Sequence, residues 1–392
     1  MSVKSFNLTI KTILVSAFFL NLAGFAVMSF LAVYLSNILA FTAVQTGTVL
    51  SFLLIFSKGL PLVTGALADK YGYKLMMEIG LIIRGGGMGI LAFSQSFPVI
   101  SIGAILIGIG AAFYEPSSRG FFSIATIGNE RKKAFTYLNL SLNGGAIVGP
   151  LLGGLLLLFN PQYPFLISAV IFFIMYFVQL FIIPPQNQMA MKHISSLEVF
   201  TSILKNKRFI IYCSSMVFFW FMYAQLTGSL PLHMYNLSNS ESLVTTVITV
   251  NALTGLLFMI LFRDLFIRVE TFKLLKSGIM IMSIALFMIS FFPSSYWLLL
   301  CVVFFTVGET LVLPSSDIAI SEFTNGKFQG AYFGFFELSF AIGATFGSYA
   351  GTVLLSHYPN SPLPWLIYLG AGMFGYLLLI TVIHLPQQNY SH

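Results

Sequence analysis

The sequence predicts an all-α membrane protein whose twelve transmembrane helices form two pseudo-symmetric bundles of six. Three observations support this fold class. The composition is far more apolar than that of a soluble protein, many apolar segments are long enough to cross a bilayer, and the second half of the chain repeats a pattern of the first. Together they indicate an integral membrane protein.

The composition excludes an ordinary soluble domain. Of the 392 residues, 57% are hydrophobic and only 8% are charged, whereas soluble domains carry about 25% charged residues. The mean hydropathy is correspondingly high, at +0.91. Cys213 and Cys301 lie inside apolar runs, so we expect small buried hydrophobic side chains rather than a disulfide or a metal site. We predict no metal and no cofactor.

Twelve apolar segments are long enough for helices that cross the hydrocarbon core, which takes about 20 residues. The first six cover approximately 12–36, 44–67, 75–95, 98–126, 134–158 and 164–183. The other six cover approximately 209–235, 243–263, 274–292, 296–322, 330–355 and 364–385. The first segment is too long for a cleaved signal peptide, so we interpret it as a span. Segments well above 20 residues are expected to tilt or to extend beyond the lipid.

An internal repeat relates the two sets of six. The stretch 108–154 matches the stretch that begins at residue 308, without a gap, and matched positions are 198 residues apart. The matched pairs include Pro116 with Pro314, Arg119 with Asp317, Gly145 with Gly343, Gly149 with Gly347, and Gly153 with Gly351. A repeat of this length indicates two similar halves.

The distribution of Lys and Arg predicts the orientation. If the N-terminus is cytoplasmic, all nineteen basic residues lie on the inner side except Lys58, Arg84 and Arg119, which lie within spans. This is a strong positive-inside bias. It predicts a multi-pass protein of the cell (inner) membrane with both termini cytoplasmic. It also accounts for the net charge of +7 without any role in nucleic-acid binding.

One long polar stretch separates the halves. Two prolines at its start, Pro184 and Pro185, stop the sixth helix. Residues 197–204 carry apolar side chains spaced as in a short amphipathic helix at the inner surface. The predicted domains are therefore an N-terminal bundle at 1–183, a cytoplasmic linker at 184–208 and a C-terminal bundle at 209–392.

The loop between the second and third spans carries a recognisable pattern at Gly65, Asp69, Lys70, Gly72 and Lys74. It resembles the cytoplasmic loop motif of the major facilitator superfamily, Gly-x-x-x-Asp-Arg/Lys-x-Gly-Arg/Lys-Arg/Lys, with Tyr73 at one basic position. The glycines allow a tight turn and close helix approach. We expect Asp69 and the lysines to latch helix ends across the inner surface. The alternative is an ordinary charged loop that sets topology.

The fifth span carries glycines at four-residue spacing, and the last of them is followed directly by another glycine. The pattern is Gly145, Gly149, Pro150, Gly153 and Gly154. It is similar to the antiporter motif of the superfamily's drug-efflux branch, although Thr136 occupies an earlier glycine position. Small residues let helices pack closely. Helix packing alone is therefore the alternative to a role in export.

The fourth span departs from the efflux pattern, because Ala104 stands where many efflux members carry an arginine. The nearest charges are Glu115 and Arg119, one helical turn apart, which favours a structural pair. Glu309 in the tenth span has no base one turn away. Buried carboxyls without a base are neutralised readily, as a proton carrier requires. The proton-coupling candidates are therefore Glu309 and, second, Glu115, with a purely structural acid as the alternative.

Two repeat-related residues of opposite charge are candidates for a gate. In the superfamily the fourth and tenth helices border the central cavity, so Arg119 and Asp317 are predicted to pair across the inner mouth in one state. The alternative is that each is satisfied within its own half, for example Arg119 by Glu115. The partners of Lys58, Arg84 and Glu337, which also lie within spans, are not evident from sequence.

The first and seventh helices line the cavity in the superfamily, and their polar and aromatic residues are candidate substrate contacts. These are Asn21, Phe25, Trp220, Tyr223 and Gln225. The alternative is incidental packing, since 42 phenylalanines place an aromatic ring near any site.

The resemblance extends over essentially the whole chain and implies a major facilitator fold, in which two bundles rock about a midplane site. It implies a secondary transporter, not an enzyme, that exports small amphipathic compounds in exchange for protons. The expected partners are a small-molecule substrate and the lipid bilayer, and we expect a monomer. The alternatives are a dedicated exporter of one metabolite or metal-chelating compound, an importer, or a non-transporting membrane sensor on the same fold.

Overall fold

The computed structural model describes residues 6–185, 196–324, 328–359 and 361–385, and these residues form helices joined by short loops, without a β-strand. Their contacts divide the chain into two compact units. Unit 1 comprises 1–200 and 324–337, and unit 2 comprises 201–323 and 338–392. Residues 186–195 of the predicted linker lie outside the described residues, and the predicted domain limits stay a prediction.

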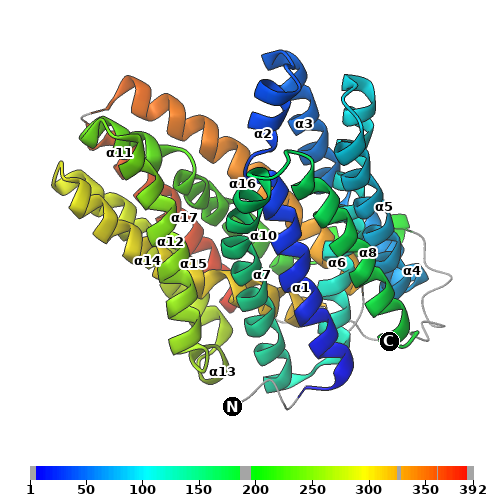
Figure 1. Ribbon diagram of the computed structural model, residues 1–392. Helices are drawn as coiled ribbons and strands as arrows, with labels where there is room; N and C mark the ends of the chain where they lie inside the picture. The colour runs from blue at the N-terminus through cyan, green and yellow to red at the C-terminus, as the bar shows by residue number, and fades with distance from the viewer. Residues whose placement is uncertain (1–5, 186–195, 325–327, 360, 386–392) are drawn as a thin grey trace. The chain divides into compact units, whose positions relative to one another are not determined.

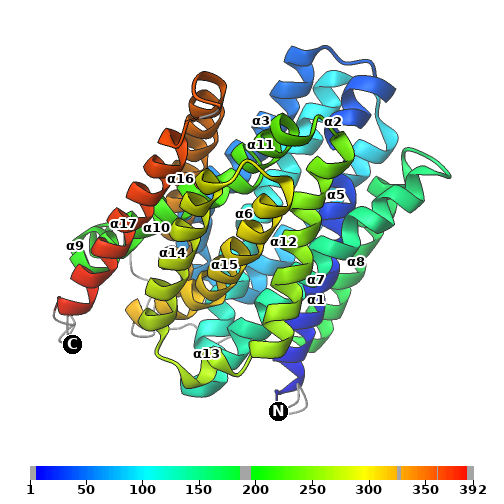
Figure 2. The same cartoon turned by 90° about the vertical axis from the view of Figure 1, so that its left-hand side faces the viewer.

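Unit 1 consists of long helices that correspond to the first six predicted spans (Figure 1). They are α1 (Leu8–Met28), α2 (Leu31–Val33) with a π-helical turn (Tyr34–Ile38), α3 (Ala43–Gly59), α4 (Pro61–Tyr71), α5 (Tyr73–Phe93), α6 (Phe97–Ala125), α7 (Gly128–Leu157) and α8 (Tyr163–Ile182). Figures 1 and 2 both show α1 and α7 side by side, as their contacts require. The short helix α9 (Ser196–Lys205) follows at the predicted amphipathic stretch.

Unit 2 contains the second set (Figure 2). It comprises α10 (Lys207–Tyr223) with a 3-10 turn (Ala224–Leu226), α11 (Ser229–Ser238), α12 (Glu241–Phe262), α13 (Leu265–Arg268), α14 (Thr271–Met288) with a 3-10 turn (Ile289–Phe291), α15 (Ser295–Phe323), α16 (Gln329–His357) and α17 (Leu363–His384). Helix α16 is shared, because its residues up to Glu337 belong to unit 1 and those from Leu338 belong to unit 2.

The second predicted span is not one straight helix. The segment 44–67 was expected to be continuous, but α3 ends at Gly59 and α4 begins at Pro61 with a bend of 45°. Proline has no backbone N–H and is well accommodated in the first turn of a helix, so Pro61 starts α4 instead of continuing α3. Hydropathy alone does not reveal this break, because both pieces are apolar.

The repeat predicted from sequence reappears in the helix limits and in one tight helix crossing of each unit. Helix α6 and helix α15 each have 29 residues and begin and end 198 positions apart. In unit 1, a side chain at Gly80 of α5 would collide with the carbonyl oxygen of Gly110 at 2.7 Å. In unit 2, a side chain at Gly278 would meet the carbonyl oxygen of Gly308 at 2.6 Å. The two units therefore build the same tight crossing from repeat-related glycines.

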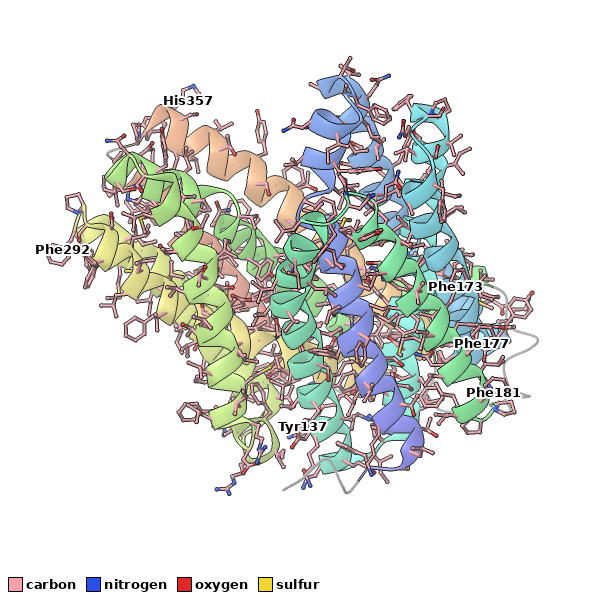
Figure 3. The ribbon with its side chains drawn as sticks, in the orientation of Figure 1. Tyr137, Phe173, Phe177, Phe181, Phe292 and His357 are labelled. Atoms are coloured by element: carbon pink, nitrogen blue, oxygen red, sulfur yellow. The ribbon has the colours of Figure 1, made fainter. Side chains whose placement is uncertain are left out.

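The described residues contain eleven helical segments long and apolar enough to cross a membrane, and twelve when the bent pair α3–α4 counts as one span. The predicted all-α membrane fold is thereby confirmed. Figure 3 shows Phe177 and Phe181 pointing outward from α8, and their side chains are 53% and 81% exposed. Large apolar side chains this exposed are expected on a surface that faces lipid rather than water.

Candidate functional site

The acid of the loop motif caps a helix that is distant in sequence. Asp69, in the last turn of α4, is only 3% exposed. Its carboxylate accepts hydrogen bonds from the backbone N–H groups of Gly330 and Ala331, both at 2.9 Å, and from the hydroxyl of Tyr73. The first N–H groups of a helix lack intrahelical acceptors and carry partial positive charge, so the carboxylate stabilises the start of α16 within unit 1.

The two glycines of the motif are required for different structural reasons. Gly72 adopts a backbone φ of +107°, a left-handed conformation that only glycine reaches without strain. Gly65 lies directly against the backbone of Gly330, and any side chain there would overlap its carbonyl group. Gly72 thus permits the turn between α4 and α5, and Gly65 permits contact between α4 and the start of α16.

The two lysines of the motif make local contacts within unit 1. The Nζ atom of Lys74 donates to the carbonyl oxygen of Leu180 at 2.9 Å and lies 3.6 Å from the carboxylate of Glu78. The Nζ atom of Lys70 lies 5.3 Å from the ring centre of Tyr71. Lys74 therefore ties α5 to the end of α8.

A group of four charged side chains lies on α3, α6 and the beginning of α16, all within unit 1. The carboxylate of Glu337 accepts from Lys58 Nζ at 2.9 Å and from Arg119 Nη1 at 3.0 Å. Lys58 also lies 3.5 Å from the carboxylate of Glu115. Glu337 is 6% exposed, and buried charges of this kind are stable only when paired. We refer to these four residues as the charge cluster.

The second buried carboxyl site lies in unit 2. Glu309 on α15 is 7% exposed and accepts a 2.6 Å hydrogen bond from the side-chain amide of Asn251 on α12. The same amide donates to the hydroxyl of Thr306 at 2.9 Å. Among the residues that the structure describes, no cation forms an ion pair with Glu309. We refer to Glu309, Asn251 and Thr306 as the carboxyl site.

One predicted substrate contact, Tyr223, interacts with the carboxyl site, and a second, Trp220, packs on Tyr223. Tyr223 on α10 interacts electrostatically with Glu309. The ring of Tyr223 packs edge-on against Trp220 with ring centres 5.1 Å apart, and Trp220 packs likewise on Phe340 at 4.8 Å. The indole N–H of Trp220 is buried and has no hydrogen-bond partner among the described residues. The structure thus combines an acid, a row of packed aromatic rings and an indole N–H that has no partner among the described residues.

Gln225 is placed differently from these two candidates. It is fully buried, and its amide nitrogen donates to the carbonyl oxygens of Phe221 and Gly347 at 2.7 and 3.0 Å. The hydroxyl of Ser229 donates to its amide oxygen at 2.6 Å. Gln225 therefore occupies the break between α10 and α11 and satisfies backbone groups there.

The glycines of the fifth-span motif face α1. Side chains at Gly145, Gly149 and Gly153 would meet backbone carbonyl oxygens of α1, whereas Gly154 has no heavy atom within 4 Å of the position of a Cβ. These carbonyls belong to Phe18, Leu22 and Ala26. The stripe thus packs α7 onto α1, with Pro150 inside α7. The link between this motif and export stays a prediction.

The two predicted contacts on the first span lie beside this stripe. The Cβ atom of Asn21 lies next to Gly145, and the Cβ atom of Phe25 lies next to Gly149. Asn21 is partly buried, and Phe25 is 43% exposed. Their contact with substrate stays a prediction.

The proposed gate residues belong to different units. Asp317 on α15 is 6% exposed and interacts electrostatically with Tyr212 of α10, within unit 2. Arg119 lies in unit 1, where it binds Glu337. The pairing of Arg119 with Asp317 stays a prediction.

The contacts of three residues of these sites were not identified from the sequence. Asn251 is a lone amide in an apolar helix, and such a residue is a signal of function or of a hydrogen-bonded partner. Tyr73 replaces a basic residue of the motif and supplies a hydroxyl donor instead. Glu337 was visible as a charge within a span, but its partner Lys58 lies 279 residues away in sequence.

Two repeated helix bundles with buried ionisable side chains define the class of multi-pass membrane transporters. The comparison with family models identifies the family. The model described as Major Facilitator Superfamily matches residues 13–289 and 226–391. The chain therefore belongs to the major facilitator superfamily, and the resemblance seen in the sequence is confirmed. It is a transporter and not an enzyme.

Similar proteins carry the name multidrug resistance protein. The chain is 27% identical over 377 residues to the multidrug resistance protein MdtH of Blochmanniella floridana, covering 94% of this chain and 92% of that protein. It is 23% identical over 381 residues to MdtH of Escherichia coli (strain K12 / DH10B), covering 95% and 94%.

Solved structures show the same fold at lower identity. A variant of the E. coli fucose:proton symporter FucP superposes with a TM-score of 0.78 and 13% identity, covering 95% of this chain and 98% of that one. The human organic anion transporter MFSD10 (TETRAN) gives a TM-score of 0.75 and 15% identity, with the same coverage of 95% and 98%.

Proposed function

We propose that this transporter exports small amphipathic compounds in exchange for protons. The observation that carries the proposal is the carboxyl site, because Glu309 is buried, bonded to an amide and free of any ion pair among the described residues. Such a carboxyl is able to exist in both protonation states without leaving an unpaired cation behind. The similarity to proteins named multidrug resistance protein MdtH supports the proposal that the compounds are drug-like.

Tyr223, which interacts with Glu309, and the adjacent Trp220 suit an amphipathic substrate. Trp220 and Tyr223 offer apolar ring surface, and the indole N–H of Trp220 is a free donor among the described residues. A compound that occupies this site competes with the proton on Glu309, and this competition couples export to proton entry. In this proposal the domains 1–183 and 209–392 rock about the site in the inner membrane, with both termini cytoplasmic.

Proton release on substrate binding tests the proposal. A panel of amphipathic dyes is added to the purified protein in weakly buffered detergent solution, and the pH change is recorded for the wild type and for Glu309→Gln. The expected result is dye-dependent proton release by the wild type and none by the variant. Glu270→Gln is the matched control, because Glu270 is exposed and lies 3.6 Å from the equally exposed Lys273.

Two outcomes would contradict the proposal. Dye binding without proton release by the wild type would exclude proton exchange at this site. Equal release by wild type and Glu309→Gln would assign the coupling to another carboxyl, with Glu115 the next to be replaced.

A further inference from the structure

Arg84 lies near the middle of a membrane-spanning helix. It follows Tyr73 by eleven residues and precedes Phe93 by nine in helix α5. At a rise of about 1.5 Å per residue it is roughly 15 Å from either end, which corresponds to the centre of a hydrocarbon core about 30 Å thick. A charge at this depth requires a compensating partner inside the protein or in a water-filled cavity.

The side chain of Arg84 points into unit 1 and not toward lipid. Arg84 shares the buried face of α5 with Gly80 and Leu91, whereas Ile82, on the opposite face, is 43% exposed. A side chain at Gly24 of α1 would lie 3.2 Å from the Nη2 atom of Arg84. The guanidinium also lies 4.9 Å from the ring centre of Phe172 on α8.

The guanidinium lacks acceptors. Among the described residues, Arg84 forms no hydrogen bond and no ion pair, and its Nε atom is shielded from solvent without a partner. Glu115 interacts with it electrostatically but forms its ion pair with Lys58. The ring of Phe172 favours a cation but accepts none of the in-plane N–H groups. These donors therefore have no acceptor among the described residues.

A second donor lies beside the guanidinium. Tyr114 of α6 interacts electrostatically with Arg84, and its hydroxyl oxygen accepts a 2.9 Å hydrogen bond from the amide of Gln179. The hydroxyl proton of Tyr114 is then available to another group. A guanidinium and a phenol hydroxyl form a donor set that suits an anion.

Arg208 of unit 2 shows how an arginine beside aromatic rings is otherwise satisfied. Its guanidinium lies 5.9 Å from the ring centre of Phe272 and 5.7 Å from that of Phe323. Unlike Arg84, it also donates from Nε to the carbonyl oxygen of Val382 at 2.9 Å. It lies in the first turn of α10, at the end of a span, and not in the middle.

We propose that Arg84 and Tyr114 form a binding site for the carboxylate of an amphipathic aromatic substrate. Guanidinium groups bind carboxylates through two parallel hydrogen bonds, and the ring of Phe172 offers contact to an aromatic body. The depth of Arg84 favours a substrate over a lipid headgroup, because headgroups lie at the membrane surface. The inference rests on the proposed function, since it assigns one polar group of the compounds transported to a site in unit 1.

Equilibrium dialysis with a matched pair of probes tests this site. The protein is placed in nanodiscs of zwitterionic lipid, and the affinities for 2-naphthoate and for its neutral analogue 2-naphthamide are compared. The wild type is expected to bind naphthoate at least about tenfold more tightly. Arg84→Gln should remove this preference, and Arg84→Lys should retain part of it.

Two further variants sharpen the test. Glu115→Gln should strengthen naphthoate binding several-fold, because a competing negative charge is removed. Arg208→Gln is the control for loss of a cation and should leave the preference for naphthoate over naphthamide unchanged.

The proposal is overturned if the wild type binds the two probes equally or binds neither. It is also overturned if folded Arg84→Gln retains the preference. If Arg84→Gln does not fold, the wild-type comparison and the Glu115→Gln variant still decide the question. If the protein releases protons on adding dyes but shows no preference for naphthoate, the site at Arg84 is excluded and the proposed function stands. If the protein prefers naphthoate but releases no protons, the site at Arg84 stands and the proposed proton exchange is contradicted.

Discussion

Buried carboxyl groups in the two units have different neighbours, although the units repeat each other. In unit 1, Glu337 is bonded to Lys58 and Arg119. In unit 2, Glu309 is bonded to an amide. Two cations hold a carboxyl in its charged form, whereas an amide donor leaves the neutral form within reach. Unit 1 therefore carries fixed charges, and unit 2 carries a carboxyl that is able to exchange its proton.

Repeat-related positions of the two units show which residues differ at these sites. Glu309 corresponds to Ala111 in unit 1, and Glu115 corresponds to Leu313 in unit 2. The crossing glycines are kept in both units, so the helix scaffold is shared while its charges are not. Helix α6 thus contributes to a structural charge site in unit 1, whereas its repeat counterpart α15 contributes to a candidate coupling site in unit 2.

The largest expected contrast concerns stability after each acid is neutralised. Glu337→Gln leaves two cations without their carboxylate and should lower the free energy of unfolding by about 3 kcal/mol. Glu309→Gln should change it by less than about 1 kcal/mol, because a glutamine amide is able to pair with Asn251. Denaturant unfolding in detergent micelles measures both. Equal losses in the two variants would mean that Glu309 has a hidden ionic partner.

A smaller effect is expected from the helix cap of unit 1. Asp69→Ala removes a carboxylate that accepts from two backbone N–H groups and a hydroxyl, so we expect a loss of about 2 kcal/mol. Asp264→Ala in unit 2 is the control and should change stability by less than about 0.5 kcal/mol, because Asp264 is exposed and makes no side-chain cap. Thermal unfolding curves compare the two. A neutral Asp69→Ala would show that the contact with α16 contributes nothing to stability.

The smallest effect should be the same in both units. Gly80→Ala and Gly278→Ala each bring a methyl group against a backbone carbonyl and should each lose about 1 kcal/mol. Gly86→Ala is the control, since no heavy atom lies within 4 Å of a Cβ there, and it should be neutral or slightly stabilising. Unfolding of all three variants in the same detergent gives the comparison. Clearly unequal losses at Gly80 and Gly278 would show that the two crossings are not equivalent.

The fold class was predictable from sequence because hydropathy, basic loops and the repeat each act over many residues. Glu309 was identified for a local reason, since no base lies one turn away. The partner Asn251 remained unnoticed because 58 residues separate it from Glu309. Lys58 and Glu337 were visible as charges in spans, but a contact over 279 residues leaves no local pattern. Tyr73 counted as a departure from the motif because the motif describes charge and not hydrogen bonding.

The glycine crossings described above also have a mechanical consequence. At Gly80 and Gly110 each helix presents its bare backbone to the other, so α5 and α6 touch without intervening side chains that could repack. Close backbone packing of this kind favours movement of α5 and α6 as a single body. Bending during a conformational cycle then concentrates at joints, and the interruption at Leu60 between α3 and α4 is a joint of this kind.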